Sequence, residues 1–208
     1  TTNEWEVKAY DGKNYITAYL GSSREITVPT LVVESDYSKI YEIYGLAALK
    51  KFNFTSIIIS EGIEALGLNI TDMEQAQQVF LSLGLMDPET YAIDAPFMRA
   101  GEGSDMIFNE SLTKFVLPDS LDVVGFYGLT GLKLKGLNTV IELKNISVLG
   151  MGALGLTEVD EIRVNLSATK TLLSISEDAF TDSTVRIITI GYGPTTIGSS
   201  AFRNCANL

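Results

Sequence analysis

Two hydrophobic patterns alternate along the chain. The first has the form apolar-x-x-apolar-x-apolar and occurs in four segments: FTSIII (54–59), LTKFVL (112–117), VDEIRV (159–164) and VRIITI (185–190). The second is an aliphatic residue separated by four residues from a Phe or Leu, and it occurs as Val124 with Leu129, Leu149 with Leu154, Ile175 with Phe180 and Ile197 with Phe202. Because the two patterns recur in the same phase, they define an internal structural repeat.

Each repeat predicts a coil that contains one strand. At the end of the first pattern apolar residues occupy every second position, which is typical of a short half-buried strand. The second pattern is too short for a full helix, and we expect a turn or a 3₁₀-like return arm there. Stacked coils bury an apolar side that a single coil leaves exposed, so the sequence predicts a β-rich solenoid with a parallel sheet on one face. In the last coil, the expected core residues are Ile197, Phe202, Cys205 and Leu208.

Residues 68–108 do not fit the repeat. Thr71 followed by Glu74 forms a capping box at the start of DMEQAQQVFLSLG, and Gly84 is suited to the C-terminal end. The apolar residues of this segment share one helical face: Ala76, Val79, Phe80 and Leu83. The pattern predicts a capped helix, in an insertion that packs against the solenoid.

The repeats resemble those of the BspA-like leucine-rich-repeat family of bacterial cell-surface proteins. Their unit reads L-x-x-I-x-I-P, a turn, then I-G-x-x-A-F-x-x-C-x-x-L, and the similar segments are TTIGSSAFRNCANL (195–208) and LTKFVLPDSLDVVG (112–125). The segment DGKNYITAYLGSSREITVPT (11–30) is similar to the strand-turn-strand that precedes the first repeat. The match is uneven, because the coil at LNTVIELK (137–144) is irregular and Leu replaces Phe at 129 and 154.

The resemblance implies a domain organisation and a function. It implies an N-terminal β-hairpin cap over residues 1–33 and a continuous leucine-rich-repeat solenoid over residues 34–208 that includes the helical insertion 68–108. It also implies an extracellular or cell-surface repeat domain that binds a host or neighbouring-cell protein or glycan, with adhesion as the usual suggested role. The alternative is a structural spacer in a larger envelope protein, and an enzyme with its chemistry in the insertion is a third hypothesis.

Composition and charge narrow the partners and the chemistry. The net charge of −11, without a basic cluster, disfavours binding to nucleic acid. The chain has no His and a single Cys, which removes the commonest general base, the commonest zinc ligand and any internal disulfide. No apolar stretch reaches the roughly 18 residues of a membrane span.

Three further features have plain structural interpretations. GMGALG (150–155) matches G-x-G-x-x-G, but a strand follows it where a dinucleotide site needs a helix. Cys205 lacks a histidine to activate it, and we expect it to pack in the core. The acidic residues are expected to be solvated in turns rather than to form a glycosidase or calcium site: Glu158, Asp160, Glu161, Glu177 and Asp178. We therefore expect no catalytic, metal or cofactor site.

The outward side of the predicted sheet is the candidate binding surface. It contains the residues that alternate with the core positions of each strand: Ile58, Val116, Glu142, Arg163 and Thr189. Glu142 and Arg163 are expected to pair across successive strands, and a merely solvated face is the alternative. Since the last coil has no polar cap, we also expect either that the chain is a fragment or that it self-associates through its C-terminal coil.

Overall fold

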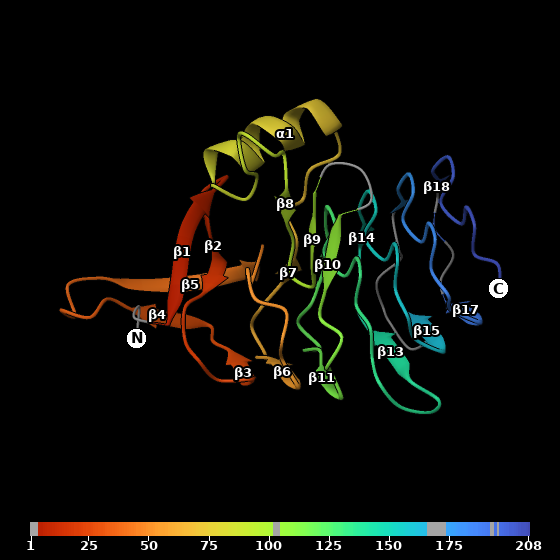
Figure 1. The fold of residues 1–208 in the computed structure, drawn as a ribbon, viewed down its shortest axis with the longest axis horizontal. Coiled ribbons are helices and arrows are strands. Elements are labelled where there is room, and N and C mark those ends of the chain that lie inside the picture. The colour runs from red at the N-terminus through yellow and green to blue at the C-terminus, as the bar shows by residue number, and fades with distance from the viewer. Residues whose placement is uncertain (1–3, 102–104, 166–173, 192–193, 195) are drawn as a thin grey trace.

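The chain forms a solenoid of stacked coils, as the repeat predicts (Figure 1). The computed structural model describes residues 4–101, 105–165, 174–191, 194 and 196–208. Coils follow one another from the N-terminal hairpin to the C-terminal end of the molecule, and each contributes a strand to two different sides of the solenoid.

One side carries two three-stranded parallel sheets. The first contains β3 (Glu25–Val28), β6 (Ser56–Ile59) and β11 (Lys114–Val116), and the second contains β13 (Val140–Leu143), β15 (Glu161–Val164) and β17 (Ile187–Ile190). The strands are in register, so that Ile57 lies beside Ile26 and Phe115. Alternate residues are buried in β6 and β15 and partly buried in β11 and β17, which confirms the strands that the first pattern predicts. The strand β13 of the irregular coil has the same alternation.

The other side carries a nine-stranded sheet. It begins with the antiparallel hairpin of β1 (Trp5–Tyr10) and β2 (Lys13–Tyr19), and continues through β5 (Ile40–Leu46). Five two-residue strands extend it: β7 (Ala65–Leu66), β12 (Val123–Val124), β14 (Val148–Leu149), β16 (Ser174–Ile175) and β18 (Thr196–Ile197). A further strand, β4 (Leu31–Val33), pairs antiparallel with β5.

The return arms therefore differ from the expected turns in one respect: each opens with a short parallel strand. A tight turn follows each of these strands. The third residue after the aliphatic residue of the second pattern has a left-handed φ of 53° to 61°, at Tyr127, Gly152, Asp178 and Ser200. No 3₁₀ helix occurs among the described residues. The residue after Val124, Leu149 and Ile197 is a glycine that lets the coils approach closely, because a Cβ there would meet the neighbouring coil at 2.3 Å (Gly125), 2.8 Å (Gly150) and 2.5 Å (Gly198).

The last coil is only partly buried. Phe202 and Cys205 are half-buried and pack against the core, whereas Ile197 and Leu208 are exposed. The expectation that all four residues fill the core is wrong for the latter two, because β18 is the edge strand of its sheet and no described strand covers it.

The insertion contains a helix and a small antiparallel sheet. The helix α1 (Met73–Ser82) is followed by β8 (Ile93–Asp94), β9 (Met98–Ala100) and β10 (Met106–Phe108), and residues 102–104 lie outside the described part of the chain. Ala76 and Phe80 are buried on the predicted apolar face, and the Phe80 ring lies 5.3 Å from that of Phe126. The predicted helix is thus confirmed, docked on the solenoid.

The helix cap lies one residue later than the sequence suggests. Asp72, not Thr71, is the N-cap, and its Oδ1 accepts a hydrogen bond of 2.9 Å from the Gln75 backbone N–H. An aspartate carboxylate at this position also interacts favourably with the helix dipole. Gly84 takes a φ of +64° just after the helix, as predicted.

The main hydrophobic core contains residues from Trp5 to Ala201, and a smaller hydrophobic cluster lies under α1. The strand β3 already pairs with β6, so residues 25–28 stack with the repeats. The division of the chain between residues 33 and 34 stays a prediction. Within the described residues, no helix combines the length and apolar character that a membrane span requires.

The cap assignment makes a prediction for α1. Asp72→Ala removes the N-cap acceptor and should lower the free energy of unfolding by about 1 kcal/mol. Thr71→Ala is the matched control and should change it little. Urea denaturation followed by circular dichroism, with hydrogen exchange of the α1 amides, measures both; equal losses in the two variants would contradict the assignment.

Candidate functional site

The five predicted residues lie on the solvent side of the two three-stranded sheets, which we call the outer face. Ile58 lies beside Val116 in the first sheet. Glu142, Arg163 and Thr189 form a row across the second sheet, in register on β13, β15 and β17. Val116, Glu142 and Thr189 are exposed, whereas Ile58 and Arg163 are partly covered. That these residues bind a ligand stays a prediction.

A second row on the outer face escaped the sequence analysis. It lies two residues before the first row and contains Val140, Glu161 and Ile187, which are in register with one another. Val140 and Ile187 are exposed although both are β-branched and apolar, and Ile187 is 52% exposed. The two-residue period of a strand, which identified Glu142 and Arg163, also places the residues two positions earlier on the outer face.

Arg163 pairs with Glu161 instead of the expected Glu142. Its Nε lies 2.7 Å from Glu161 Oε1 and its Nη2 lies 2.8 Å from Oε2, a bidentate ion pair within one strand. Residues two apart on a strand point to the same side, so this pairing needs no reach across the sheet. The guanidinium lowers the pKa of the Glu161 carboxyl.

A groove of about 230 Å³ divides the outer face between β11 and β13, which share no hydrogen-bonded ladder. It is lined by Val116, Val140 and Glu142, and at its base by Phe115 and Leu117. Phe115 and Leu117 are only half-buried, whereas the corresponding Ile162 and Val164 of β15 are fully buried. The groove therefore exposes side chains that belong to the core positions of the repeat.

The irregular coil explains the groove. Between Leu132 and Val140 the chain forms a protruding loop, with Leu137 94% exposed. Hydrogen bonds join the two coils at both ends of the groove: the Lys135 backbone N–H donates to the Leu112 carbonyl, and Lys144 Nζ donates to Asp119 Oδ1. The groove is thus held open by the fold.

One carboxylate joins three successive coils beside the second sheet. Asp160 Oδ2 accepts a hydrogen bond of 2.8 Å from the Thr139 backbone N–H, and Oδ1 accepts one of 2.8 Å from Arg186 Nη2. The Thr139 N–H, with smaller contributions from the Thr139 hydroxyl and Arg186, lowers the pKa of Asp160 below its ordinary value of 3.8. Asp160 was expected to be a solvated turn residue, and the structure gives it a linking role.

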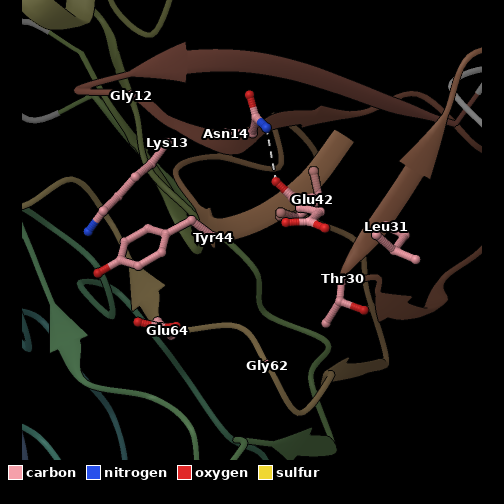
Figure 2. A pocket seen from close by; sticks show the side chains of 10 residues that line it. Gly12, Lys13, Asn14, Thr30, Leu31, Glu42, Tyr44, Gly62 and Glu64 are labelled. Atoms are coloured by element: carbon pink, nitrogen blue, oxygen red, sulfur yellow. Dashed lines mark hydrogen bonds between the residues drawn. The ribbon is translucent and has the colours of Figure 1, made fainter. Parts of the chain in front are cut away.

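A larger hollow of about 550 Å³ lies at the N-terminal end (Figure 2). Its walls come from four segments: the turn between β1 and β2, residues 30–31 at the start of β4, β5, and the turn that contains Gly62. Lys13 Nζ lies 3.7 Å from the centre of the Tyr44 ring, and the Glu42 and Glu64 side chains lie along the same hollow. Sequence reasoning missed it because the four segments share no motif.

The other motifs that the sequence offers have structural surroundings. No group of three His, Cys, Asp or Glu side chains among them is placed to hold a metal ion. Residues 150–155, which match G-x-G-x-x-G, form a turn, and Gly150 packs against the backbone of Gly125. A dinucleotide-binding loop would instead lead into a helix. Cys205 is half-buried, and its Sγ donates to the Phe180 carbonyl at 3.1 Å.

One family model and one solved structure are similar to this chain. A family model described as BspA type leucine rich repeat region matches residues 103–208 in six copies. The crystal structure of a leucine-rich-repeat protein from T. pallidum is similar over all of this chain and 89% of that chain, with 13% sequence identity and a TM-score of 0.47. No match to a curated protein was found.

The Asp160 contacts predict an acid-dependent stability. Because the folded pKa is lowered, the contribution of Asp160 is complete above its unfolded pKa and is lost as the pH falls through the folded value. Asp160→Asn should therefore destabilise the chain at pH 7, and the difference from the unchanged chain should shrink below about pH 4. Thermal unfolding across this range measures the difference, with Asp11→Asn in an exposed turn as control; a difference independent of pH would contradict the assignment.

Proposed function

We propose a binding function from one premise: the chain belongs to the BspA-type leucine-rich-repeat family, whose model matches just over half of its length. Repeat domains of this family typically bind proteins, and the fold generally serves as a non-catalytic scaffold. We propose that this chain acts outside a bacterial cell and binds a partner protein through its outer face. Adhesion to a host or a neighbouring cell is the role that we propose for that contact.

One observation carries the proposal: the outer face exposes β-branched apolar side chains on three of its strands, β11, β13 and β17. Outward positions of a sheet with one solvated side are normally polar, yet Val116, Val140 and Ile187 are exposed there. Val116 and Val140 line the same groove, so that the apolar surface continues from one sheet to the next. A single exposed aliphatic residue needs no explanation, but three on one face, two of which line one groove, support an interaction site.

The charged residues of the face suit a protein interface. Arg163 is held by Glu161 through two hydrogen bonds, so that its guanidinium is already oriented before a partner arrives. A side chain fixed in this way loses less conformational entropy on binding. The predicted residues Ile58, Glu142 and Thr189 surround this pair and the groove with a mixed apolar and polar rim.

Two other assignments are outcomes of the same test. A glycan ligand would favour polar and aromatic groups over β-branched aliphatic ones, so the face suits a protein better. A spacer role would leave the outer face without a ligand. An array of host proteins and glycans, probed with the whole chain, separates the three.

Self-association through the last coil is a second proposal. Ile197 and Leu208 are exposed there, and Phe202 and Ile188 are only half-buried. The edges of β17 and β18 offer backbone groups to which a strand of another copy can bond.

Binding through the outer face predicts a loss of affinity without a loss of stability. Val140→Ser with Ile187→Ser should weaken binding of the partner found on the array tenfold or more, because both side chains lie in the apolar contact. The free energy of unfolding should stay within about 0.5 kcal/mol, since both are exposed. Leu20→Ser, at an equally exposed site away from the face, is the matched control, and biolayer interferometry gives the dissociation constants. Unchanged affinity in the double variant would contradict the face assignment.

Self-association predicts a concentration-dependent mass. Light scattering should show dimers as the protein concentration rises. Ile197→Lys should dissociate them, because it places a charge in the contact. The matched change Leu20→Lys should leave the mass unchanged. A chain that remains monomeric at every concentration would refute this second proposal.

A further inference from the structure

A small apolar pocket lies between α1 and the segment that leads into β8. Its floor is formed by Ala76, Phe80 and Phe126, which are buried, and its mouth by Met73 and Tyr91, which are each 52% exposed. The pocket encloses about 200 Å³. Sites for cofactors and drug-sized ligands occupy roughly 300–1,000 Å³, so this pocket has the size for an inserted side chain.

The pocket is separate from the outer face. Figure 1 shows α1 on one side of the solenoid and the strands β3, β6, β11 and β13 on the opposite side. It is formed by the insertion where α1 meets the solenoid, and only Phe126 comes from the repeats. A partner bound here would leave the outer face free.

Acidic residues lie one or two positions along the chain from residues that line the pocket, and we call this group its acidic rim. Asp72 and Glu74 flank Met73 in the chain, and Asp87 follows the lining residue Met86. Asp87 Oδ1 accepts hydrogen bonds from the backbone N–H groups of Thr90 (2.8 Å) and Glu89 (2.9 Å). These bonds lower the pKa of Asp87 and keep it ionised at neutral pH.

Arg99 offsets part of the charge of Asp87, since its guanidinium helps to lower the pKa of that carboxyl. Among the described residues, no ion pair joins Glu74 or Glu89. The lysines that contact α1 lie at its other end, where Lys8 Nζ donates to the Leu83 carbonyl and Lys50 Nζ to the Gly84 carbonyl. The pocket thus combines an apolar interior with an acidic rim.

We propose that this pocket binds a basic segment of a partner protein, which inserts one large apolar side chain between Met73 and Tyr91. Lysine or arginine residues beside that side chain pair with Glu74 and Glu89. The charges of rim and segment are complementary, and the methionines at Met73 and Met86 adapt to the shape of the inserted group. Because the rim charges are exposed, this interaction weakens as the salt concentration rises.

Three fluorescent peptides test the proposal with the whole chain. The first has a central leucine between two pairs of lysines, the second has serine in place of the leucine, and the third has glutamates in place of the lysines. Fluorescence anisotropy should show binding of the first peptide only, weaker at about 0.15 M salt than at low ionic strength. Failure of the first peptide to bind at about 1 mM, or equal binding of all three, would overturn the proposal.

Variants assign the binding to the pocket. Met73→Ser with Tyr91→Ser should weaken binding of the first peptide at least tenfold, and Leu20→Ser should not. Glu74→Gln with Glu89→Gln should weaken it several-fold and reduce the salt dependence, whereas Glu4→Gln with Glu177→Gln should not. Equal effects of rim and control variants would show that the peptide follows the net charge alone, and would overturn the proposal.

The methionine methyl groups give a direct view of the site. In a sample with ¹³C-labelled methionine methyls, the first peptide should shift the NMR signals of Met73 and Met86, while that of Met106, on β10, should stay in place. Light scattering on the same sample detects a second copy as the occupant. If the chain forms a dimer and Met73→Ser dissociates it, the occupant of the pocket is a second copy of the chain. That result would refute the assignment to a basic partner segment.

Discussion

Successive coils approach one another most closely along their short strands, and the rest of the solenoid depends on that approach. At Gly125 and Gly150 the neighbouring backbone occupies the space of a Cβ. The same glycines donate the hydrogen bonds that continue the ladder, to the carbonyls of Leu66 and Val124 at 2.7 Å. Since the coils touch here through backbone alone, the larger side chains of each coil are directed inward, where Leu129, Leu154 and Phe180 form the core.

Function is left to the surfaces that this stacking does not use. In the strands of the outer face, the inward residues pack in the core and stabilise the fold. The outward residues Val140 and Ile187 do not contribute to that core. The insertion adds a second surface by placing α1 over Phe126. One repeat scaffold thereby presents two surfaces of different character, the first mixed and β-branched, the second apolar with an acidic border.

Most of the fold was predictable because the repeat states it many times over. The alternation in segments such as VDEIRV identified Ile162 and Val164 as core residues, and both are fully buried. The helix was predictable from its apolar face, but the choice between Thr71 and Asp72 as cap was not, since both are good N-caps and only the backbone geometry decides. Arg163 illustrates the same limit. The spacing between strands allows an ion pair with Glu142, but in the structure Arg163 forms a bidentate ion pair with Glu161.

Features that depend on several distant segments left no signal. The hollow at Lys13 and Tyr44 depends on the relative placement of four separate segments, and the groove beside Val116 depends on the path of an irregular coil. In the sequence that coil is only a weak match to the repeat. Its effect on the surface follows from the way in which Leu132 and Val140 are anchored on either side of the loop.

The missing ladder between β11 and β13 also bears on mechanics. In a repeat array each coil is stabilised mainly by its two neighbours. The coils that contain β11 and β13 still share the short-strand ladder between β12 and β14, but they lack the second ladder that joins the coils of β13, β15 and β17. This junction is therefore the weakest link in the array. A force applied along the solenoid axis would separate these two coils first. The N-terminal and C-terminal blocks on either side would each keep their three-stranded sheet.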